Sequence, residues 1–261
     1  MDPVLISLDG GVLCITLNRP EKLNALNPEM HKLLRGALER AADEADARCI
    51  LLTGAGRAFC TGQDLSERKV APGAAPIDLS LSLGSNYNPL VRRMRALPKP
   101  IVCAVNGVAA GAGANIALAC DIVLAARSAA FVQAFCRLGL VPDSGGTYFL
   151  PRLVGAARAM GLALLGDKLS AEDAERWGLI WKAVEDEKLA ETALSLARTL
   201  AGGPTKGYGL IKKALLASPG NSLDAQLDLE RDLQREAGFS ADYREGVAAF
   251  LEKRPPRYTG K

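Results

Sequence analysis

The sequence contains one histidine, His31, and its six cysteines show no CxxC spacing. A zinc or iron site therefore lacks ligands, and we expect no metal. Ser144 has no GxSxG motif around it, and His31 lies in a stretch with helical, amphipathic spacing where partial exposure is usual, so a serine triad is disfavoured. Most of the cysteines stand in apolar runs, where free cysteine behaves as a small hydrophobic residue, and a reducing cytoplasm is expected.

The chain also lacks a strong charge of either sign. Lys and Arg number 32 against 29 Asp and Glu, a net charge of +3 that does not indicate a nucleic-acid partner. The first ten residues, MDPVLISLDG, lack the basic and apolar regions of a secretory signal. The apolar span from Ile101 to Ala126 includes Asn106, Asn115 and Asp121, which favours a buried strand, helix and strand over a membrane segment. We expect no membrane partner.

The first part of the chain alternates between strand and helix signals. Two β-rich runs flank Asp9-Gly10-Gly11 and predict a hairpin. Asn27 and Pro28 supply an N-cap and a first-turn residue for a helix that runs to about Asp46. CILLTG, residues 49–54, predicts a buried strand. It is followed by a loop, AGRAFCTGQDL, by a flexible segment rich in Pro, Ala and Gly, and by a helix that ends near Arg95.

The second half predicts more of the same sheet and then helices. KPIVCAV and DIVLAA indicate strands on either side of the small-residue helix GAGANIALAC, which predicts a largely parallel α/β sheet covered on both faces. Ser170 and Asp173 form a capping box for a helix that Gly178 ends, and LIWKAVED predicts a last short strand. Beyond Lys188 the pattern is helical.

Two glycine-rich segments invite a functional interpretation. Gly111-Ala112-Gly113 opens a helix after a strand, but Ile116 replaces the third glycine of a dinucleotide-binding motif and the next strand ends without an acidic residue. The other segment is Cys60 to Asp64, after a strand. If both leave backbone N–H groups free and converge, they form an oxyanion hole that stabilises negative charge on a carbonyl oxygen. Close packing of glycine is the alternative explanation.

Taken together, four runs of sequence resemble the enoyl-CoA hydratase/isomerase, or crotonase, superfamily: NRPEKLNAL, GAGRAFCTGQDL, KPIVCAVNGVAAGAGANIALACDI and LGLVPDSGGTYFLPRLVG. The likeness continues through SAEDAERWGLI and REGVAAFLEKR. It implies an α/β spiral of β-β-α units in residues 1–195, and a C-terminal helical region in residues 196–261 used for trimer formation. A trimer or dimer of trimers is the expected assembly.

The resemblance also implies roles for individual residues. The backbone N–H groups of Gln63 and Ala112 would polarise a thioester carbonyl. Coenzyme A would enter as part of the acyl-CoA substrate, with no separate cofactor. The positions expected to line the coenzyme A and acyl site are Lys22, Leu23, Ala25, Asp64, Leu65 and Asn115, together with Phe250 and Lys253, which would reach a neighbouring subunit's coenzyme A. Helix packing and a solvated charge are the alternatives for Phe250 and Lys253, and a hydrogen-bonded buried amide is the alternative for Asn115.

One departure from the family pattern points to the reaction. Family hydratases use two glutamates, and the matching positions here are Asn115 and Phe135, neither of which exchanges a proton. Asp143, in GLVPDSGGT, matches an aspartate that the resemblance places in isomerases and dehalogenases. We therefore expect Asp143 to be the catalytic carboxylate, shuttling a proton from the α-carbon to the γ-carbon of a thioester. Turn chemistry is the alternative, because Pro, Asp, Ser and Gly are all common in turns.

Within the family, NYNPLVRRMRALPKP, ARSAAF and LDLERDLQREAG most resemble isomerases of phenylacetate catabolism that convert an aromatic ring epoxide to an oxepin. The resemblance implies Δ3–Δ2 enoyl-CoA isomerase activity as well. The alternatives are a hydratase, a hydrolase or dehalogenase of the same family, and a non-enzymatic protein that only binds coenzyme A esters or RNA.

Overall fold

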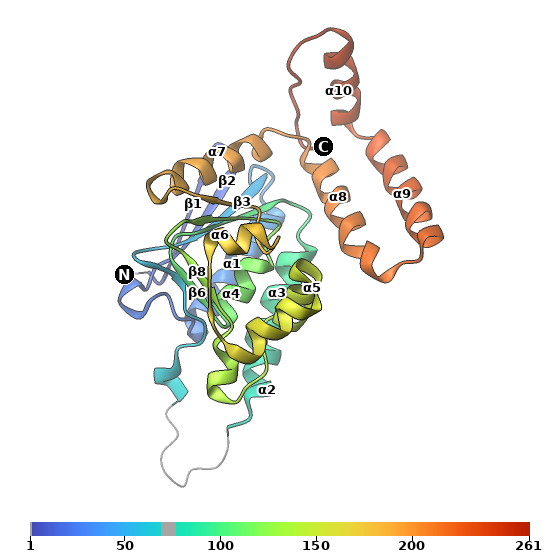
Figure 1. Cartoon of the computed structure of the whole chain (residues 1–261). Helices are drawn as coiled ribbons and strands as arrows, with labels where there is room; N and C mark the ends of the chain where they lie inside the picture. Colours follow the sequence, from blue (N-terminus) through green and yellow to red (C-terminus); the bar gives the residue numbers. More distant parts are fainter. Residues whose placement is uncertain (1, 69–76) are drawn as a thin grey trace.

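A computed structural model describes residues 2–68 and 77–261 of the chain. Most of the predicted flexible segment lies outside the described residues. The described part contains two β-sheets wrapped by helices, followed by an arm of three helices (Figure 1). The predicted α/β class is confirmed.

The larger sheet has six strands in the order β1-β2-β3-β5-β7-β10. Only β1 and β2 pair antiparallel, across a two-residue turn in which Gly10 and Gly11 both have positive φ, as glycine allows in a tight hairpin. The other neighbours pair in parallel, as predicted from their apolar runs. The strands are β1 (Val4–Asp9), β2 (Val12–Leu17), β3 (Cys49–Gly54), β5 (Ile101–Val105), β7 (Ile122–Ala126) and β10 (Lys182–Val184).

A second sheet of four short strands was not predicted. Its order is β4-β6-β8-β9, and its members are β4 (Ala58–Cys60), β6 (Val108–Ala110), β8 (Ala130–Val132) and β9 (Lys168–Ser170). The first of these falls within the run AGRAFCTGQDL, which was wrongly expected to be only a loop. Each of β3, β5 and β7 is followed at once by a short strand of the second sheet. This repeated step from sheet to sheet produces the expected spiral without any repeat in sequence.

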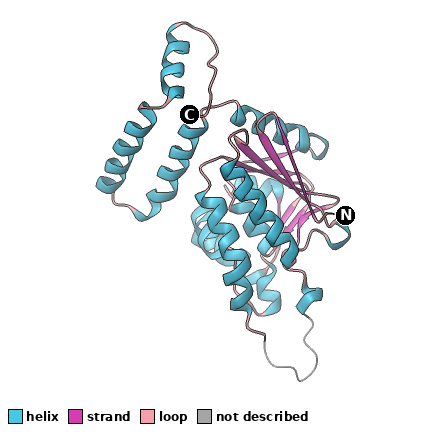
Figure 2. Cartoon of the chain, turned by 180° about the vertical axis from the view of Figure 1, so that it is seen from behind, coloured by secondary structure: helices cyan, strands magenta, loops and turns pink. Residues whose placement is uncertain are grey.

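Helices cover both faces of the larger sheet (Figures 1 and 2). On the inner face, Ile15 and Ile50 meet Leu34 of α1 (Pro28–Asp43), Met94 of α3 (Asn88–Ala96) and Ile116 of α4 (Ala112–Leu118). On the outer face lies α7 (Leu189–Ala201). The remaining core helices are α2 (Leu79–Ser82), joined to α3 by a π-helical turn (Leu83–Tyr87), α5 (Gly146–Leu165) and α6 (Ala171–Arg176).

The predicted helix caps are confirmed. The Asn27 side chain accepts a hydrogen bond from Met30 N at the start of α1, and Ser170 does the same for Asp173 N at the start of α6. Such caps satisfy backbone N–H groups that have no partner within the helix. The end of α1 differs from prediction, because it stops at Asp43 rather than near Asp46.

Three helices form a C-terminal arm that extends away from the sheets (Figure 1). They are α8 (Thr205–Ala217), α9 (Leu223–Gly238) and α10 (Ala241–Leu251). The last ten residues are not helical, contrary to prediction, and return along the arm: Asp242 accepts hydrogen bonds from Thr259 N and Gly260 N. The predicted boundary after residue 195 falls inside α7, which packs on the larger sheet.

Candidate active site

The loop after β4, residues 61–65, is held against the loop of residues 22–26. Leu26 N donates to Gly62 O at 2.7 Å, and Asp64 N donates to Leu26 O at 3.0 Å. Leu26 and Gln63 form an isolated parallel bridge as a result. Two segments that the resemblance assigned to coenzyme A therefore lie side by side.

Buried polar side chains fix both loops. Asn24 is fully buried and donates to the carbonyls of Ala55 and Ala58. Asp64 is also buried and accepts a 2.9 Å hydrogen bond from Arg19, while Ser66 donates to its other oxygen. The hydrogen bonds from Ser66, and then those from Arg19, lower the pKa of Asp64. Because this carboxylate is engaged inside the loop, only the backbone of Asp64 is available to line a groove.

The two predicted oxyanion segments meet. A Cβ atom added to Gly62 would lie 3.2 Å from Ala112 N and 3.1 Å from Ala110 O. One added to Gly113 would lie 2.3 Å from Cys60 O, closer than any side chain tolerates. Glycine at these positions lets the backbone beside Gln63 approach the start of α4 directly. The packing explanation and the functional explanation are therefore compatible.

The N-terminus of α4 presents a backbone donor. Gly111, with φ 54° and ψ −127°, precedes the helix and provides no side-chain cap. Ala112 is the first residue of α4, so its N–H has no partner within the helix, and no acceptor for it occurs within residues 2–68 and 77–261. Phe135 lies beside this turn, because a Cβ at Gly111 would be 3.8 Å from its Cζ atom. Apolar surface therefore borders the donor.

Asp143 lies at the turn that starts α5, and its backbone is tied to α4. The carbonyl oxygen accepts hydrogen bonds from Gly146 N at 2.8 Å and from the side-chain nitrogen of Asn115 at 2.8 Å. The Ser144 hydroxyl donates to Asp143 Oδ1 at 2.8 Å. Ser144 is therefore buried and engaged with the carboxylate rather than placed as a nucleophile.

Asn115 has a structural partner on each side. It is fully buried on α4, donates to Asp143 O, and accepts from the side chain of Gln133 at 2.9 Å. These bonds are those of a satisfied buried amide, the alternative expected for Asn115, and a contact with substrate stays a prediction. Gln133 was missed from sequence, because no local pattern reveals a glutamine that reaches a residue 18 positions away.

The Gln63 side chain contacts Tyr87, which in turn packs on His31, and the sequence did not reveal these contacts. Tyr87 donates to Gln63 Oε1 at 2.9 Å, and the Tyr87 ring meets the ring of His31 edge to face, with centroids 4.2 Å apart. His31 is buried, contrary to the expected partial exposure. Burial, and then the nearby charge of Arg35, lower the pKa of His31 to about 4, so the ring is neutral at physiological pH.

The other predicted binding residues lie at varied depths. Lys22 and Leu65 are exposed near the loops, Leu23 is half-buried, and Ala25 is buried. Phe250 is 82% exposed and lies in α10, and Lys253 follows that helix. Figure 1 shows α10 on the arm, far from the two sheets. Within one chain the structure does not bring these two residues to Asp143, and contact with a second subunit stays a prediction.

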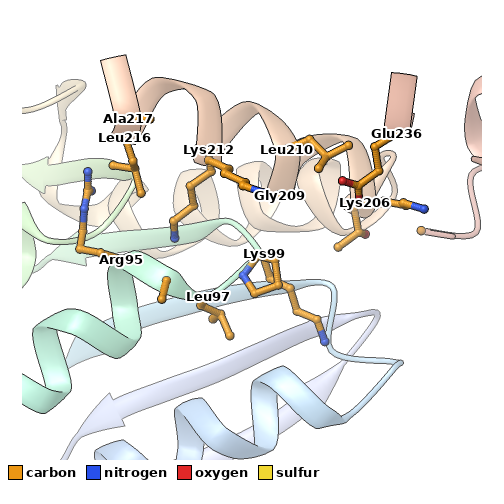
Figure 3. Close-up of a pocket in the computed structure, with 15 residues that line it drawn as sticks. Arg95, Leu97, Lys99, Lys206, Gly209, Leu210, Lys212, Leu216, Ala217 and Glu236 are labelled. Carbon is orange, nitrogen blue, oxygen red and sulfur yellow. The ribbon is translucent and has the colours of Figure 1, made fainter. Parts of the chain in front are cut away.

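A large cavity lies away from these residues. It has a volume of about 650 Å³ and separates α8 from the connection between α3 and β5 (Figure 3). Lys99 on its wall donates to the carbonyls of Ala41 and Glu44, and Lys212 donates to Met94 O and Asp121. Both lysines are already hydrogen-bonded to protein groups. We therefore interpret the cavity as the gap between the core and the C-terminal arm. A smaller cavity of about 230 Å³ borders Gln63 itself.

No group of three or more metal-ligating side chains occurs in the described part of the chain. Burial raises the pKa of the Cys60 thiol, on β4 beside α4, to about 12, which excludes it as a thiolate nucleophile. One helix, α5, is long and apolar enough to cross a membrane, but Gly155, with φ 77° and ψ 163°, kinks it. Its residues Phe149, Leu150 and Val154 belong to the core.

Comparison with known proteins identifies the family. The model of the enoyl-CoA hydratase/isomerase family matches residues 7–261. The chain belongs to this family. It is 60% identical, over the full length of both chains, to 1,2-epoxyphenylacetyl-CoA isomerase of Escherichia coli K12. It is 54% identical to a protein of Rhodobacter capsulatus named "Probable enoyl-CoA hydratase", over 96% of this chain and 95% of that one.

A solved member of the enoyl-CoA hydratase/isomerase family has the same architecture. The crystal structure of an enoyl-CoA hydratase from Bacillus anthracis superposes with a TM-score of 0.93 at 32% identity, covering 99% of this chain and 100% of that one. The coverage includes the C-terminal arm. The spiral core and the arm are therefore features of the family fold rather than additions of this chain.

Proposed function

We propose that this chain is an acyl-CoA isomerase in which Asp143 is the single general acid and base. The observation that supports it most directly is the hydrogen bond from Asn115 to the backbone of Asp143, which ties the carboxylate-bearing turn to α4, one helical turn from the Ala112 donor. The identity to an epoxyphenylacetyl-CoA isomerase supports the same class of reaction.

The reaction needs only one proton carrier. With the thioester carbonyl oxygen at the N–H groups of Gln63 and Ala112, the Asp143 carboxylate removes a proton from the α-carbon of a 3-enoyl-CoA. The electron pair moves onto the carbonyl oxygen as an enolate, whose charge the two donors stabilise. The protonated Asp143 then returns the proton to the γ-carbon, and the double bond lies between the α- and β-carbons. No atom is gained or lost.

The same parts suit an aromatic ring epoxide. Breaking the carbon–carbon bond that the epoxide shares with the six-membered ring gives an oxepin of the same composition. Bringing one of its double bonds into conjugation with the thioester then moves a proton from the α-carbon to a ring carbon, and Asp143 can carry that proton. Phe135 beside Gly111 supplies apolar surface near the reacting carbons. We propose 1,2-epoxyphenylacetyl-CoA as a substrate on the strength of the relative that carries this name, with a place in phenylacetate catabolism.

Hydration is the second candidate, favoured by the 54% identical relative. Addition of water requires one group to activate the water and another to protonate the α-carbon. The chain has Asn115 and Phe135 where family hydratases have glutamates, and both side chains are buried and uncharged. We therefore infer that hydratase activity is weak.

The test is a comparison of two esters in ¹⁸O-water. We expect the first ester, a 3-enoyl-CoA, to be isomerised. In a parallel experiment in ²H₂O, solvent deuterium should enter at its α- or γ-carbon. Crotonyl-CoA should give little labelled 3-hydroxybutyryl-CoA. Labelled product that forms as fast as the 3-enoyl ester is isomerised would refute the isomerase proposal and favour the hydratase.

Assembly and location complete the proposal. The arm exposes large apolar side chains, including Leu215, Leu227 and Phe250, as subunit interfaces do. We propose a homotrimer or dimer of trimers, with Phe250 and Lys253 reaching a neighbour's coenzyme A, in the cytoplasm. The substrate itself carries coenzyme A, so no further cofactor, nucleic acid or membrane is part of the proposed function.

A further inference from the structure

Two buried amides form a chain that ends at the backbone of Asp143. Gln133 Nε2 donates to Asn115 Oδ1 at 2.9 Å, and Asn115 Nδ2 donates to Asp143 O at 2.8 Å. Gln133 is 3% exposed and Asn115 is fully buried. Gly146 packs directly against the Asn115 amide, because a Cβ at position 146 would lie 2.3 Å from Asn115 Nδ2. Water is therefore kept from both bonds.

The position of Asn115 links the two halves of the proposed site. It lies three residues after Ala112 on α4, so its side chain and the Ala112 N–H belong to one rigid turn of helix. The carbonyl that it holds belongs to Asp143, which bears the proposed proton carrier. One amide thus fixes the distance between the Ala112 N–H and the backbone of Asp143.

Gln133 determines which end of the Asn115 amide meets Asp143. The oxygen and nitrogen of an amide are nearly equal in size, and a reversed Asn115 would point its oxygen at the Asp143 carbonyl oxygen. The Gln133 N–H, by occupying Asn115 Oδ1, favours the orientation in which nitrogen faces Asp143. Its own Oε1 is then left buried without a partner among the described residues.

That unpaired oxygen is informative. A buried acceptor without a partner is destabilising, and such groups in native proteins call for an explanation. An apolar residue of similar size at position 133 would fill the same volume and remove this unpaired oxygen, but it would leave Asn115 Oδ1 without its donor. The cost is explained if the donor end of Gln133 is needed to orient Asn115.

We propose that Gln133 and Asn115 are positioning residues that hold Asp143 in register with the oxyanion donor at Ala112. This inference rests on the proposed function for its catalytic consequence. The structural consequence, a fixed backbone at residues 143–146, does not depend on which reaction the site performs.

The decisive variant is Gln133→Met, which keeps the volume and removes both polar atoms. We expect kcat for 3-enoyl-CoA isomerisation to fall by about tenfold, since small misplacements of a reacting group are costly. The KM for the ester should stay within about twofold. The melting temperature should change little, because removal of the unpaired Gln133 Oε1 offsets the loss of the donor to Asn115 Oδ1. A purely structural residue would lose stability together with activity.

Ile116→Val is the matched control. Ile116 is buried on the same helix but faces the core, away from the amide chain. The Ile116→Val substitution should lower the melting temperature and leave kcat near the wild-type value. If Gln133→Met keeps the wild-type kcat, or if its kcat falls only in step with a lowered melting temperature as in a destabilised control, the positioning role is wrong.

Gln133→Glu adds a pH signature. A protonated carboxyl can donate to Asn115 Oδ1 and an ionised one cannot, and burial raises the pKa of such a group. The ratio of the variant's kcat to that of the wild type should therefore rise as the pH is lowered. A ratio independent of pH would contradict the orienting hydrogen bond.

Hydrogen exchange separates this inference from the proposed function. Gly146 N donates to the carbonyl that Asn115 holds, so the amides of residues 143–146 should exchange faster in Gln133→Met than in the wild type. If the wild type turns over no 3-enoyl-CoA but exchange still accelerates, the proposed function fails and the positioning role stands. Unchanged exchange would overturn the positioning role whatever the activity.

Discussion

Asp143 combines a structural role with a proposed catalytic one, because its backbone oxygen is held by hydrogen bonds and its side chain is the proposed proton carrier. The hydrogen bonds from Gly146 N and Asn115 end on the main chain, and they would survive any change of the carboxylate. Turn chemistry and catalysis were alternatives in the sequence. In the structure the turn is what delivers the carboxylate to the start of α5.

Asp143→Asn should therefore preserve the fold and abolish turnover. The amide keeps the shape and can still accept from the Ser144 hydroxyl, but it cannot take up a proton. We expect kcat to fall by about 10²–10⁴-fold, the usual contribution of a general acid or base. Titration calorimetry with a saturated acyl-CoA should give a Kd close to that of the wild type. A variant that retains a tenth of the activity would exclude Asp143 as the only proton carrier.

His31 makes folding stability depend on pH. Its pKa is about 4 in the fold against 6.5 for an unperturbed histidine, so the unfolded chain takes up the proton first as the pH falls. Above pH 6.5 both states are neutral and nothing is lost; between pH 6.5 and 4 the free energy of unfolding decreases, by at most about 3 kcal/mol. His31→Phe keeps a ring in contact with Tyr87 but cannot take up a proton. Denaturant titrations at a series of pH values should therefore show a free energy of unfolding that depends less on pH than in the wild type, and an unchanged pH dependence would refute the assignment.

Longer elements were predictable because their signals are local. The hairpin at Gly10-Gly11, the Asn27 cap of α1 and the runs CILLTG and KPIVCAV all carry their own pattern, and each appears where it was expected. The three-residue strands β4, β6 and β8 carry no period that could be recognised. They pair with residues about 20 to 50 positions away, so only the assembled spiral defines them.

The candidate site was predicted in its parts but not in its connections. Gly62 and Gly113 could be identified as places of close approach, yet which backbone they approach depends on the stacking of β4 against α4. Similarly, Asn115 was recognised as a non-acidic residue, but its partner Gln133 lies on a different segment after β8. Long-range pairs of neutral side chains leave no pattern in a single sequence.

Gly62→Ala tests the approach of the β4 loop to α4. The new methyl group would lie 3.2 Å from Ala112 N, at a φ of +87° that favours glycine. We expect kcat/KM to fall by about 10²-fold, comparable to losing one oxyanion donor, because the loop must move away from the Ala112 N–H or cover it. Steady-state kinetics with a 3-enoyl-CoA would measure this.

Gly36→Ala is the control for that substitution. Gly36 lies in α1 with open space around its Cβ position, so alanine should leave kcat/KM unchanged and stabilise the helix by about 0.5–1 kcal/mol. Equal activities of the two variants would show that the approach of Gly62 to Ala112 has no role in catalysis.

The arm has an apolar surface that a single chain leaves uncovered. On α10, Tyr243, Val247 and Leu251 follow one another at intervals of four residues, and they are 56%, 42% and 73% exposed. This spacing places them on one face of the helix, as in a helix that packs against a partner. The tail of residues 258–261 is held against the start of α8 by Arg48 and against α10 by Asp242, so the arm has a defined shape before any partner binds.

Val247→Glu should dissociate the assembly without unfolding the core. Light scattering after gel filtration should give about three or six times 27.5 kDa for the wild type and a smaller mass for the variant, because an unpaired charge is costly in an apolar interface. Arg244→Gln, on a neighbouring exposed position, should keep the wild-type mass.

Since Phe250 and Lys253 are proposed to reach a neighbour's coenzyme A, KM for the ester should rise in the dissociated variant while circular dichroism shows the folded α/β core. A wild type that elutes as a monomer with full activity would contradict both the assembly and the proposed role of Phe250 and Lys253.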